Sequence, residues 1–178
     1  MSTWRFHLAK LVVVILAAAA LWAQKPVPPP VAEKLPLAPP EQPLPFSHKI
    51  HVGQAAIKCQ DCHAIKDPGF QAGYPKEAVC MGCHVTVKSD SPAIQKLAAL
   101  AKAKTPAPWV KIYSVPEIVW FSHSVHVKEA KLECADCHGP VAERDVLFKE
   151  KPTNMFSCMA CHSKRGASNG CDVCHNTQ

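Results

Sequence analysis

Five times along the chain, two cysteines three positions apart are followed at once by a histidine. These five Cys-x-x-Cys-His motifs contain all ten cysteines of the 178-residue sequence, so none is left for a disulfide. Cysteine pairs alone are also found in zinc sites and in redox dithiols, but a histidine directly after every pair argues against both. Cys-x-x-Cys-His is the attachment sequence for c-type haem. The sequence therefore predicts five covalently bound haems.

Each motif supplies two attachment points and one iron ligand. Two thiols three positions apart reach the two vinyl groups on one porphyrin edge, and the adjoining imidazole is then held beneath the iron. The predicted attachment cysteines are Cys59, Cys62, Cys80, Cys83, Cys134, Cys137, Cys158, Cys161, Cys171 and Cys174. The predicted proximal iron ligands are His63, His84, His138, His162 and His175.

The remaining histidines point to the opposite faces of the irons. FSHKIHV at residues 46–52 and FSHSVHV at residues 121–127 contain every histidine outside the motifs except His7, namely His48, His51, His123 and His126. Residues three apart lie on one side of a helical turn and on opposite faces of an extended strand. Either geometry lets the two histidines of one phrase reach two different irons, so we predict all four as distal ligands.

Four distal histidines leave one iron of five without a second imidazole. Met155, in the stretch PTNMFSCMACH, is the leading candidate, because a thioether is the other common sixth ligand and raises the reduction potential. Two alternatives stay open at this point. Met155 fills a gap in a haem-lined interior, or the fifth iron has an open position of the kind that a reductase of nitrite or peroxide needs.

The first 45 residues predict an exported protein. Residues 1–23 carry Arg5 and Lys10 before an apolar run of residues 11–23. This run is shorter than the about 20 residues of a bilayer span, so residues 1–23 are a cleaved signal peptide or, if the apolar length extends back to residue 8, a retained membrane anchor. Residues 24–45 contain nine prolines and are expected to form an extended linker.

Residues 46–178 are predicted to form one pentahaem domain. Repeat one spans 46–84 and repeat two spans 121–162, a helical connector covers 91–104, and the fifth motif, 171–175, stands outside the repeats. The connector pattern starts at Ser91 and Pro92 and stops at Thr105 and Pro106. With roughly 27 residues per haem, the porphyrins must supply most of the apolar interior. We expect a mostly irregular, haem-templated fold with short α-helices and no substantial β-sheet.

The formal charge of +6 suggests a nucleic-acid or membrane-surface partner until the haems are included. Loss of residues 1–23 removes two positive charges, and five haems bring ten propionates against one net positive charge per ferric iron. The holoprotein then carries about −1 when oxidised and about −6 when reduced. Nucleic acid is therefore not expected as a partner.

The spacing of Phe-x-His-x-x-His before a Cys-x-x-Cys-His motif resembles that of the class III multihaem cytochromes, the cytochrome c3 and c7 group. The resemblance implies that the first histidine of each phrase serves the haem of the next motif and that the second serves another haem. Accordingly, His48 and His123 would ligate the haems of the Cys59 and Cys134 motifs, and His51 and His126 would cross to neighbouring haems.

A longer run, PWVKIYSVPEIVWFSHSVHVKEAKLECADCH followed by PTNMFSCMACH, is similar to the small pentahaem subunit of alternative complex III and to cytochrome subunits of related quinone reductase complexes. This resemblance implies electron relay at the outer, periplasmic face of the membrane. The implied partners are iron–sulfur or quinone-reactive membrane subunits and an acceptor such as a soluble cytochrome. We therefore predict an electron carrier, as a complex subunit or a free periplasmic shuttle, rather than an enzyme; the alternative is a multihaem reductase.

Overall fold

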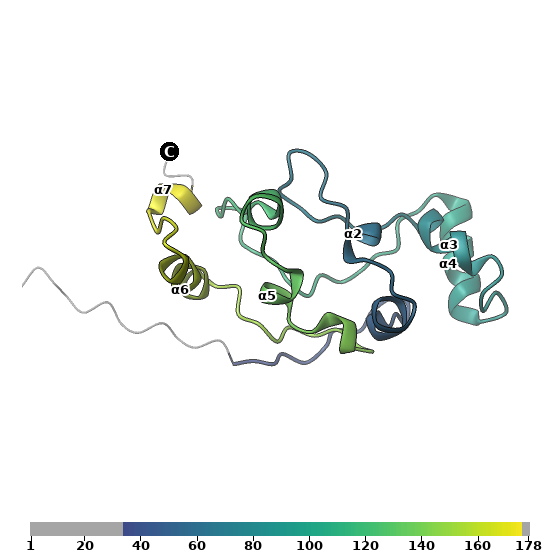
Figure 1. Ribbon diagram of the computed structural model, residues 1–178. Helices are drawn as coiled ribbons and strands as arrows, with labels where there is room; N and C mark the ends of the chain where they lie inside the picture. The colour runs from purple at the N-terminus through teal and green to yellow at the C-terminus, as the bar shows by residue number, and fades with distance from the viewer. Residues whose placement is uncertain (1–33, 176–178) are drawn as a thin grey trace, which may run out of the picture. The chain divides into compact units, whose positions relative to one another are not determined.

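The computed structural model describes residues 34–175 as short helices joined by irregular chain (Figure 1). The elements are η1 (Lys49–Gln54), α2 (Cys59–Cys62), α3 (Glu77–His84), α4 (Pro92–Ala103), η2 (Ser124–Glu129), α5 (Cys134–His138), η3 (Val141–Glu143), α6 (Met155–Arg165) and α7 (Cys171–Cys174). Strand-like pairing within residues 34–175 is limited to two isolated bridges, Ile65 with Ala72 and Val119 with His175. The predicted fold class is confirmed.

The predicted leader, residues 1–23, and the first part of the proline-rich linker lie outside the described residues. Among the helices that are described, none combines the length and the apolar character needed to cross a bilayer.

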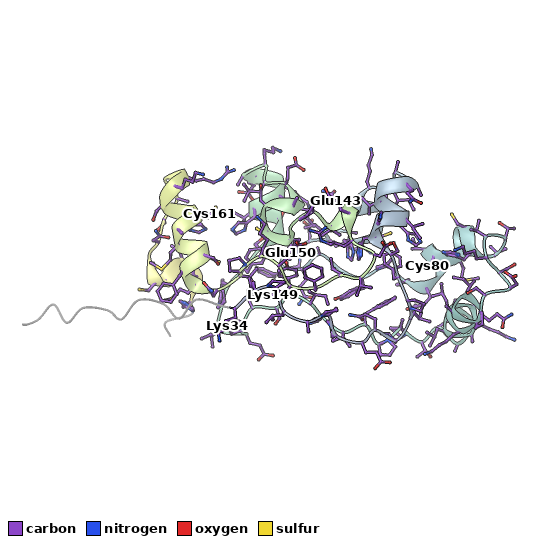
Figure 2. The ribbon with its side chains drawn as sticks, turned by 90° about the horizontal axis from the view of Figure 1, so that it is seen from below. Lys34, Cys80, Glu143, Lys149, Glu150 and Cys161 are labelled. Atoms are coloured by element: carbon purple, nitrogen blue, oxygen red, sulfur yellow. The ribbon has the colours of Figure 1, made fainter. Side chains whose placement is uncertain are left out.

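Every Cys-x-x-Cys-His motif includes a helical turn. Motifs one, three and five form the short helices α2, α5 and α7, whereas motif two lies in α3 and motif four in α6; Cys80 of α3 and Cys161 of α6 are labelled in Figure 2. Residues three apart on a helix lie on one side, so the two thiols of a motif share a face. In motifs one and three an aspartate fixes the turn, because Asp61 Oδ2 and Asp136 Oδ2 accept the backbone N–H of the residue before the first cysteine, at 3.0 and 3.1 Å.

Both histidine phrases form a π-helical turn. In η1 the N–H of Ala55 donates to Ile50 O at 2.9 Å, and in η2 the N–H of Ala130 donates to Val125 O at 2.9 Å, so each bond spans five residues. Such wide turns are rare and are often found at functional sites. With about 4.4 residues per turn, side chains three positions apart diverge more than they do on an α-helix. The sequence left helical and extended geometries open; the structure has this third one.

The small apolar core lies where α4 packs against α3, as Figure 1 shows. Within the described residues, the buried apolar side chains are Leu44, Leu97 and Ala107. Glu77 of α3 is buried beside them, and its Oε1 accepts the N–H of Ala107 at 2.7 Å. The α4 helix has Ser91 as N-cap residue and ends at Lys104 in the left-handed conformation. The apolar face of α4 therefore packs the second motif, in α3, against Leu44 and Ala107.

Large apolar side chains are exposed in most of the other described segments. Ile118, Trp120 and Val85 have exposed fractions of 68%, 64% and 60%. A chain of this size that left so much apolar surface in water would gain too little from burial to offset its conformational entropy. The polypeptide is therefore built to close around apolar groups that it does not itself contain.

Candidate haem-binding sites

Each predicted distal histidine faces a proximal histidine of a Cys-x-x-Cys-His motif. The ring centroids are separated by 6.4 Å for His48 and His63, 6.0 Å for His51 and His84, 6.5 Å for His123 and His138, and 6.1 Å for His126 and His162. The ring planes are nearly parallel in the first and third pairs, at 12° and 3°. They are inclined at 54° for His51 with His84 and at 29° for His126 with His162.

These separations fit a metal ion between the rings. A metal–imidazole bond is about 2.0 Å, and the centre of a five-membered ring with bonds of about 1.33 Å lies roughly 1.1 Å from its nitrogen, so two opposed ligands have centroids about 6.2 Å apart. Rings stacked directly on one another would lie closer, as Phe46 and His51 do at 4.3 Å. The residues present therefore fit irons with two axial imidazoles.

Most of these rings are oriented through Nδ1, which lies against a backbone carbonyl. The bonds join His51 to Ser47 (2.8 Å), His63 to Gly73 (2.8 Å), His84 to Val87 (2.9 Å), His123 to Phe70 (2.9 Å), His126 to Ser122 (2.8 Å), His162 to Ser168 (2.7 Å) and His175 to Ile118 (3.3 Å). A carbonyl oxygen can only accept, so Nδ1 must carry the hydrogen in each bond. The lone pair of Nε2 is thereby left free for a metal.

Two of the facing rings, His48 and His138, have a pKa that burial lowers. Burial, reinforced by the nearby imidazoles of His63 and His51, lowers the pKa of His48 to about 4. Burial, together with His123 and His63, also lowers the pKa of His138. Both environments keep the ring neutral, which is the form that binds a metal. The Nδ1 atom of His48 is buried without a hydrogen-bond partner in the described part of the chain.

Half of the predicted attachment cysteines are partly enclosed, namely Cys62, Cys80, Cys134, Cys137 and Cys174, and the other five are exposed. Burial is the largest cause that raises the pKa of Cys62, Cys80, Cys134, Cys137 and Cys158, and neighbouring cysteines raise each of them further. Thiols of different motifs thus lie within electrostatic reach of one another, so haems attached to these motifs would have their attachment edges close together.

Two phenylalanines contact the predicted distal histidines, a role that the sequence argument missed. Phe46 stacks on His51 at 4.3 Å and meets His48 edge-on at 4.8 Å, and Phe121 does the same with His126 at 4.7 Å and His123 at 4.8 Å. One aromatic ring therefore fixes both histidines of its phrase. The signal was present, because phenylalanine opens both copies of the phrase.

The two tyrosines of the chain lie against proximal histidines. Tyr74 meets the ring of His63 at 5.9 Å, and Tyr113 meets that of His138 edge-on at 4.6 Å. The Tyr113 hydroxyl also accepts the backbone N–H groups of Glu150 and Lys151, at 3.1 and 3.2 Å. No pattern around either tyrosine in the sequence indicates these contacts.

The fifth motif is arranged differently. His175 pairs through its backbone with Val119, and no imidazole faces it among residues 34–175. Met155 is the first residue of α6 and has an exposed fraction of 52%. Its assignment to the fifth iron stays a prediction.

Comparison with known proteins identifies the class. The family model for cytochrome c7 and related cytochrome c matches residues 119–177. The protein is accordingly a multihaem c-type cytochrome with covalently bound haems.

Two relatives extend the match toward the N-terminus. The multiheme cytochrome c subunit of menaquinone reductase from Nitratidesulfovibrio vulgaris is 30% identical over 161 residues, which cover 76% of this chain and 77% of that protein. The multiheme cytochrome MtrA from Shewanella baltica is 26% identical over 121 residues, 67% of this chain but 28% of MtrA. The chain belongs to the family of multihaem cytochromes c that includes the menaquinone reductase subunit, and its function is electron transfer.

Proposed function

We propose that the protein binds five haems, one per motif, numbered 1 to 5 in chain order, and that four of them have two axial histidines. His48 and His63 hold haem 1, and His51 and His84 hold haem 2. His123 and His138 hold haem 3, and His126 and His162 hold haem 4. The distances of 6.0 to 6.5 Å between the ring centroids of the paired histidines carry this proposal.

Bound haem supplies one-electron iron chemistry, and the chain's own residues decide how that chemistry is used. At the four haems that paired histidines would hold, two neutral imidazoles would occupy the iron and would leave no ligand position for a substrate. The backbone carbonyls that accept from Nδ1 increase the basicity of the imidazoles and favour the ferric state. The residues are thus arranged for electron transfer rather than for bond making.

His175 and Met155 complete haem 5 in this proposal. Cys158 lies three residues after Met155 on α6, so the two side chains share a side of the helix. Cys158 is also close enough to Cys174 of the fifth motif for the two thiols to interact electrostatically. Met155 is therefore on the side of α6 that is directed at the fifth motif.

Carbon monoxide binding to the reduced holoprotein tests this coordination. We expect five haems per chain by iron analysis and no carbon monoxide bound, because every iron has two axial ligands. Met155→Ala is expected to bind one carbon monoxide per chain, and Met155→His none. Met159→Ala, which removes the methionine inside the fourth motif, is the matched control and is expected to bind none.

The outcomes separate the alternatives. One carbon monoxide bound per wild-type chain would contradict a ligated fifth iron and would favour the reductase alternative. A Met155→Ala protein that binds none would instead show that another group ligates haem 5.

The protein is, in this proposal, the electron-transfer subunit of a quinone-linked complex at the periplasmic face of the membrane. The relative's description as a subunit of menaquinone reductase supports this placement. Its partners are iron–sulfur or quinone-reactive membrane subunits on one side and an acceptor such as a soluble cytochrome on the other. Membrane fractionation with N-terminal sequencing tests it. A protein that is found in the soluble fraction and begins at Gln24 would favour a free periplasmic carrier.

A further inference from the structure

The two repeats exchange equivalent contacts. The N–H of Ser124 in η2 donates to Gly69 O at 3.0 Å, and the N–H of Lys49 in η1 donates to Arg144 O at 3.0 Å. Lys49 and Ser124 are 75 positions apart, and so are Gly69 and Arg144. One contact is thus made twice with the repeats interchanged. Such reciprocity is the property of an interface around a two-fold axis.

Further contacts join the same segments. On one side, His123 Nδ1 donates to Phe70 O at 2.9 Å and Ser122 Oγ donates to Gly69 O at 3.4 Å. On the other side, Ser47 Oγ donates to Asp145 Oδ1 at 2.7 Å, and η1 packs against η3. In each repeat, the segment that follows the first motif therefore supports the histidine turn of the other repeat.

An ion pair stiffens the second of these segments. Arg144 donates from Nη2 and Nε to the two carboxylate oxygens of Glu150, at 2.9 and 3.2 Å. Glu143 and Glu150, which are labelled in Figure 2, lie at the two ends of this segment. A bidentate pair of this geometry restrains both side chains.

Residues near a two-fold axis meet their own equivalents. Cys59 and Cys134 are equivalent by the 75-residue shift, and their thiols lie within electrostatic reach of each other. Their haems, 1 and 3, therefore have their attachment edges side by side at the axis.

The two π-helical turns, η1 and η2, determine which other haems are neighbours. The ligands of haems 1 and 2 are three residues apart on one π-helical turn and contact one phenylalanine ring, and Cys80 lies within electrostatic reach of Cys62. The ligands of haems 3 and 4 share the second turn in the same way. Cys137 correspondingly lies within electrostatic reach of Cys158, and also of Cys161.

The fifth motif has no counterpart in repeat one and extends one end of the array. Its Cys174 lies within electrostatic reach of Cys158 of motif four. Its position is fixed by the residues just before repeat two, because the N–H of Trp120 donates to Cys174 O at 2.8 Å and His175 Nδ1 donates to Ile118 O.

We propose that an internal two-fold axis relates the repeats and sets the spatial order of the haems as 2, 1, 3, 4, 5, with haems 1 and 3 adjacent across the axis. The order of the motifs in the chain is therefore not the order of the electron path. Haems 2 and 5 are its two ends, so one redox partner docks beside α3 and α4 and the other beside α7. This inference rests on the ligand pairs of the proposed function.

Counting the magnetic neighbours of single haems tests the order. A histidine-to-methionine change at a distal position raises the reduction potential of that haem, so it can be reduced alone at a poised potential. Reduction makes a low-spin iron diamagnetic and removes its coupling to adjacent ferric irons, which changes their electron paramagnetic resonance signals. We expect His51→Met, at haem 2, to alter the signal of one other haem. His48→Met, at haem 1, and His126→Met, at haem 4, are each expected to alter two.

Ile50→Met is the matched control, because Ile50 lies between the two histidines of the first turn and is exposed; it should raise no potential. Two signals altered by His51→Met, or one altered by His48→Met, would overturn the order while leaving the ligand assignment intact. A His48→Met protein in which no haem changes its potential would overturn the ligand pair itself, and with it the order.

Discussion

At the scale of single residues, the ligand set depends on side chains that bind no metal. Phe46 has an exposed fraction of 38% even though it contacts two imidazoles, so much of its ring is available to the apolar group beside them. Aromatic contacts of this kind contribute about 0.5–1.5 kcal/mol each beyond area burial. Phe46 and Phe121 each contact two of the proposed distal imidazoles, and we expect them to determine how firmly these imidazoles are held.

Phe46→Leu is expected to weaken the ligation of haems 1 and 2. Axial imidazoles leave iron when protons compete for Nε2, so weaker ligation moves this loss to higher pH. Each haem loses one aromatic contact, and a weakening of about 0.5–1.5 kcal/mol corresponds to roughly half to one pH unit, because one unit is 1.36 kcal/mol. An acid titration followed by the loss of the low-spin haem spectrum measures the shift.

Two variants control this titration. Phe121→Leu should produce the same shift at haems 3 and 4. Phe70→Leu should produce almost none, because Phe70 serves His123 through its backbone carbonyl and its ring is half exposed. Equal shifts in Phe46→Leu and Phe70→Leu would contradict the role given to the Phe46 ring.

At the scale of elements, the contacts between the repeats depend on a close backbone approach at Gly69. Gly69 has φ +84°, and a Cβ added there would collide with Cβ of Ser124. Glycine is therefore required at this position for two reasons: its φ is positive, and η2 leaves no space for a Cβ.

Gly69→Ala is expected to destabilise the holoprotein by about 1–3 kcal/mol more than Gly166→Ala does. Gly166 also has a positive φ, +68°, but a Cβ there would meet nothing within 4 Å, so that variant reports the backbone strain alone. Denaturant titration of both proteins gives the difference. Equal losses would mean that the Gly69 segment does not press on η2.

The sequence predicted the parts of the site that a local pattern encodes. Cys-x-x-Cys-His spacing is local, and so are the paired phrases, which is why the haem ligands could be proposed before any fold was known. The carbonyl partners of Nδ1 are not local in the same sense. Phe70 O lies 53 residues before His123, and Gly73 O serves His63 only because the intervening chain turns back. These acceptors are backbone atoms, which leave no trace in residue type.

The π-helical turns and the exchange between repeats escaped prediction for a related reason. A phrase of seven residues with two histidines fits an α-helical, extended or π-helical geometry equally well by composition. The bonds that select the wide turn, such as that from Ala55 to Ile50, join backbone groups. The 75-residue repeat was visible, but a repeat alone does not say whether its copies stack in line or face each other.

At the scale of the whole molecule, three buried apolar side chains among residues 34–175 cannot hold a chain of this length folded. Stability must come from the porphyrins and from the coordination bonds, as it does in small domains that fold around a metal.

The chain produced without haem attachment is therefore expected to be unfolded. Circular dichroism should show little helix, and limited proteolysis should cut throughout residues 46–175 at rates that the holoprotein does not show. A stable, helical chain free of haem would contradict this account of the fold.

The short separation of His48 and His51 on one π-helical turn also has a consequence for the kinetics of folding. Each proposed coordination bond closes a loop, and the loop from His48 to His63 is shorter than that from His51 to His84, so the first closes at a lower entropic cost. Three residues of separation do not prevent the wrong histidine from reaching an iron first. We expect refolding from denaturant at neutral pH to pass through misligated species that must release an imidazole before the native pairs form. Stopped-flow absorbance should show this as a slow phase that shortens as the pH falls, because protonated imidazole does not hold the wrong iron.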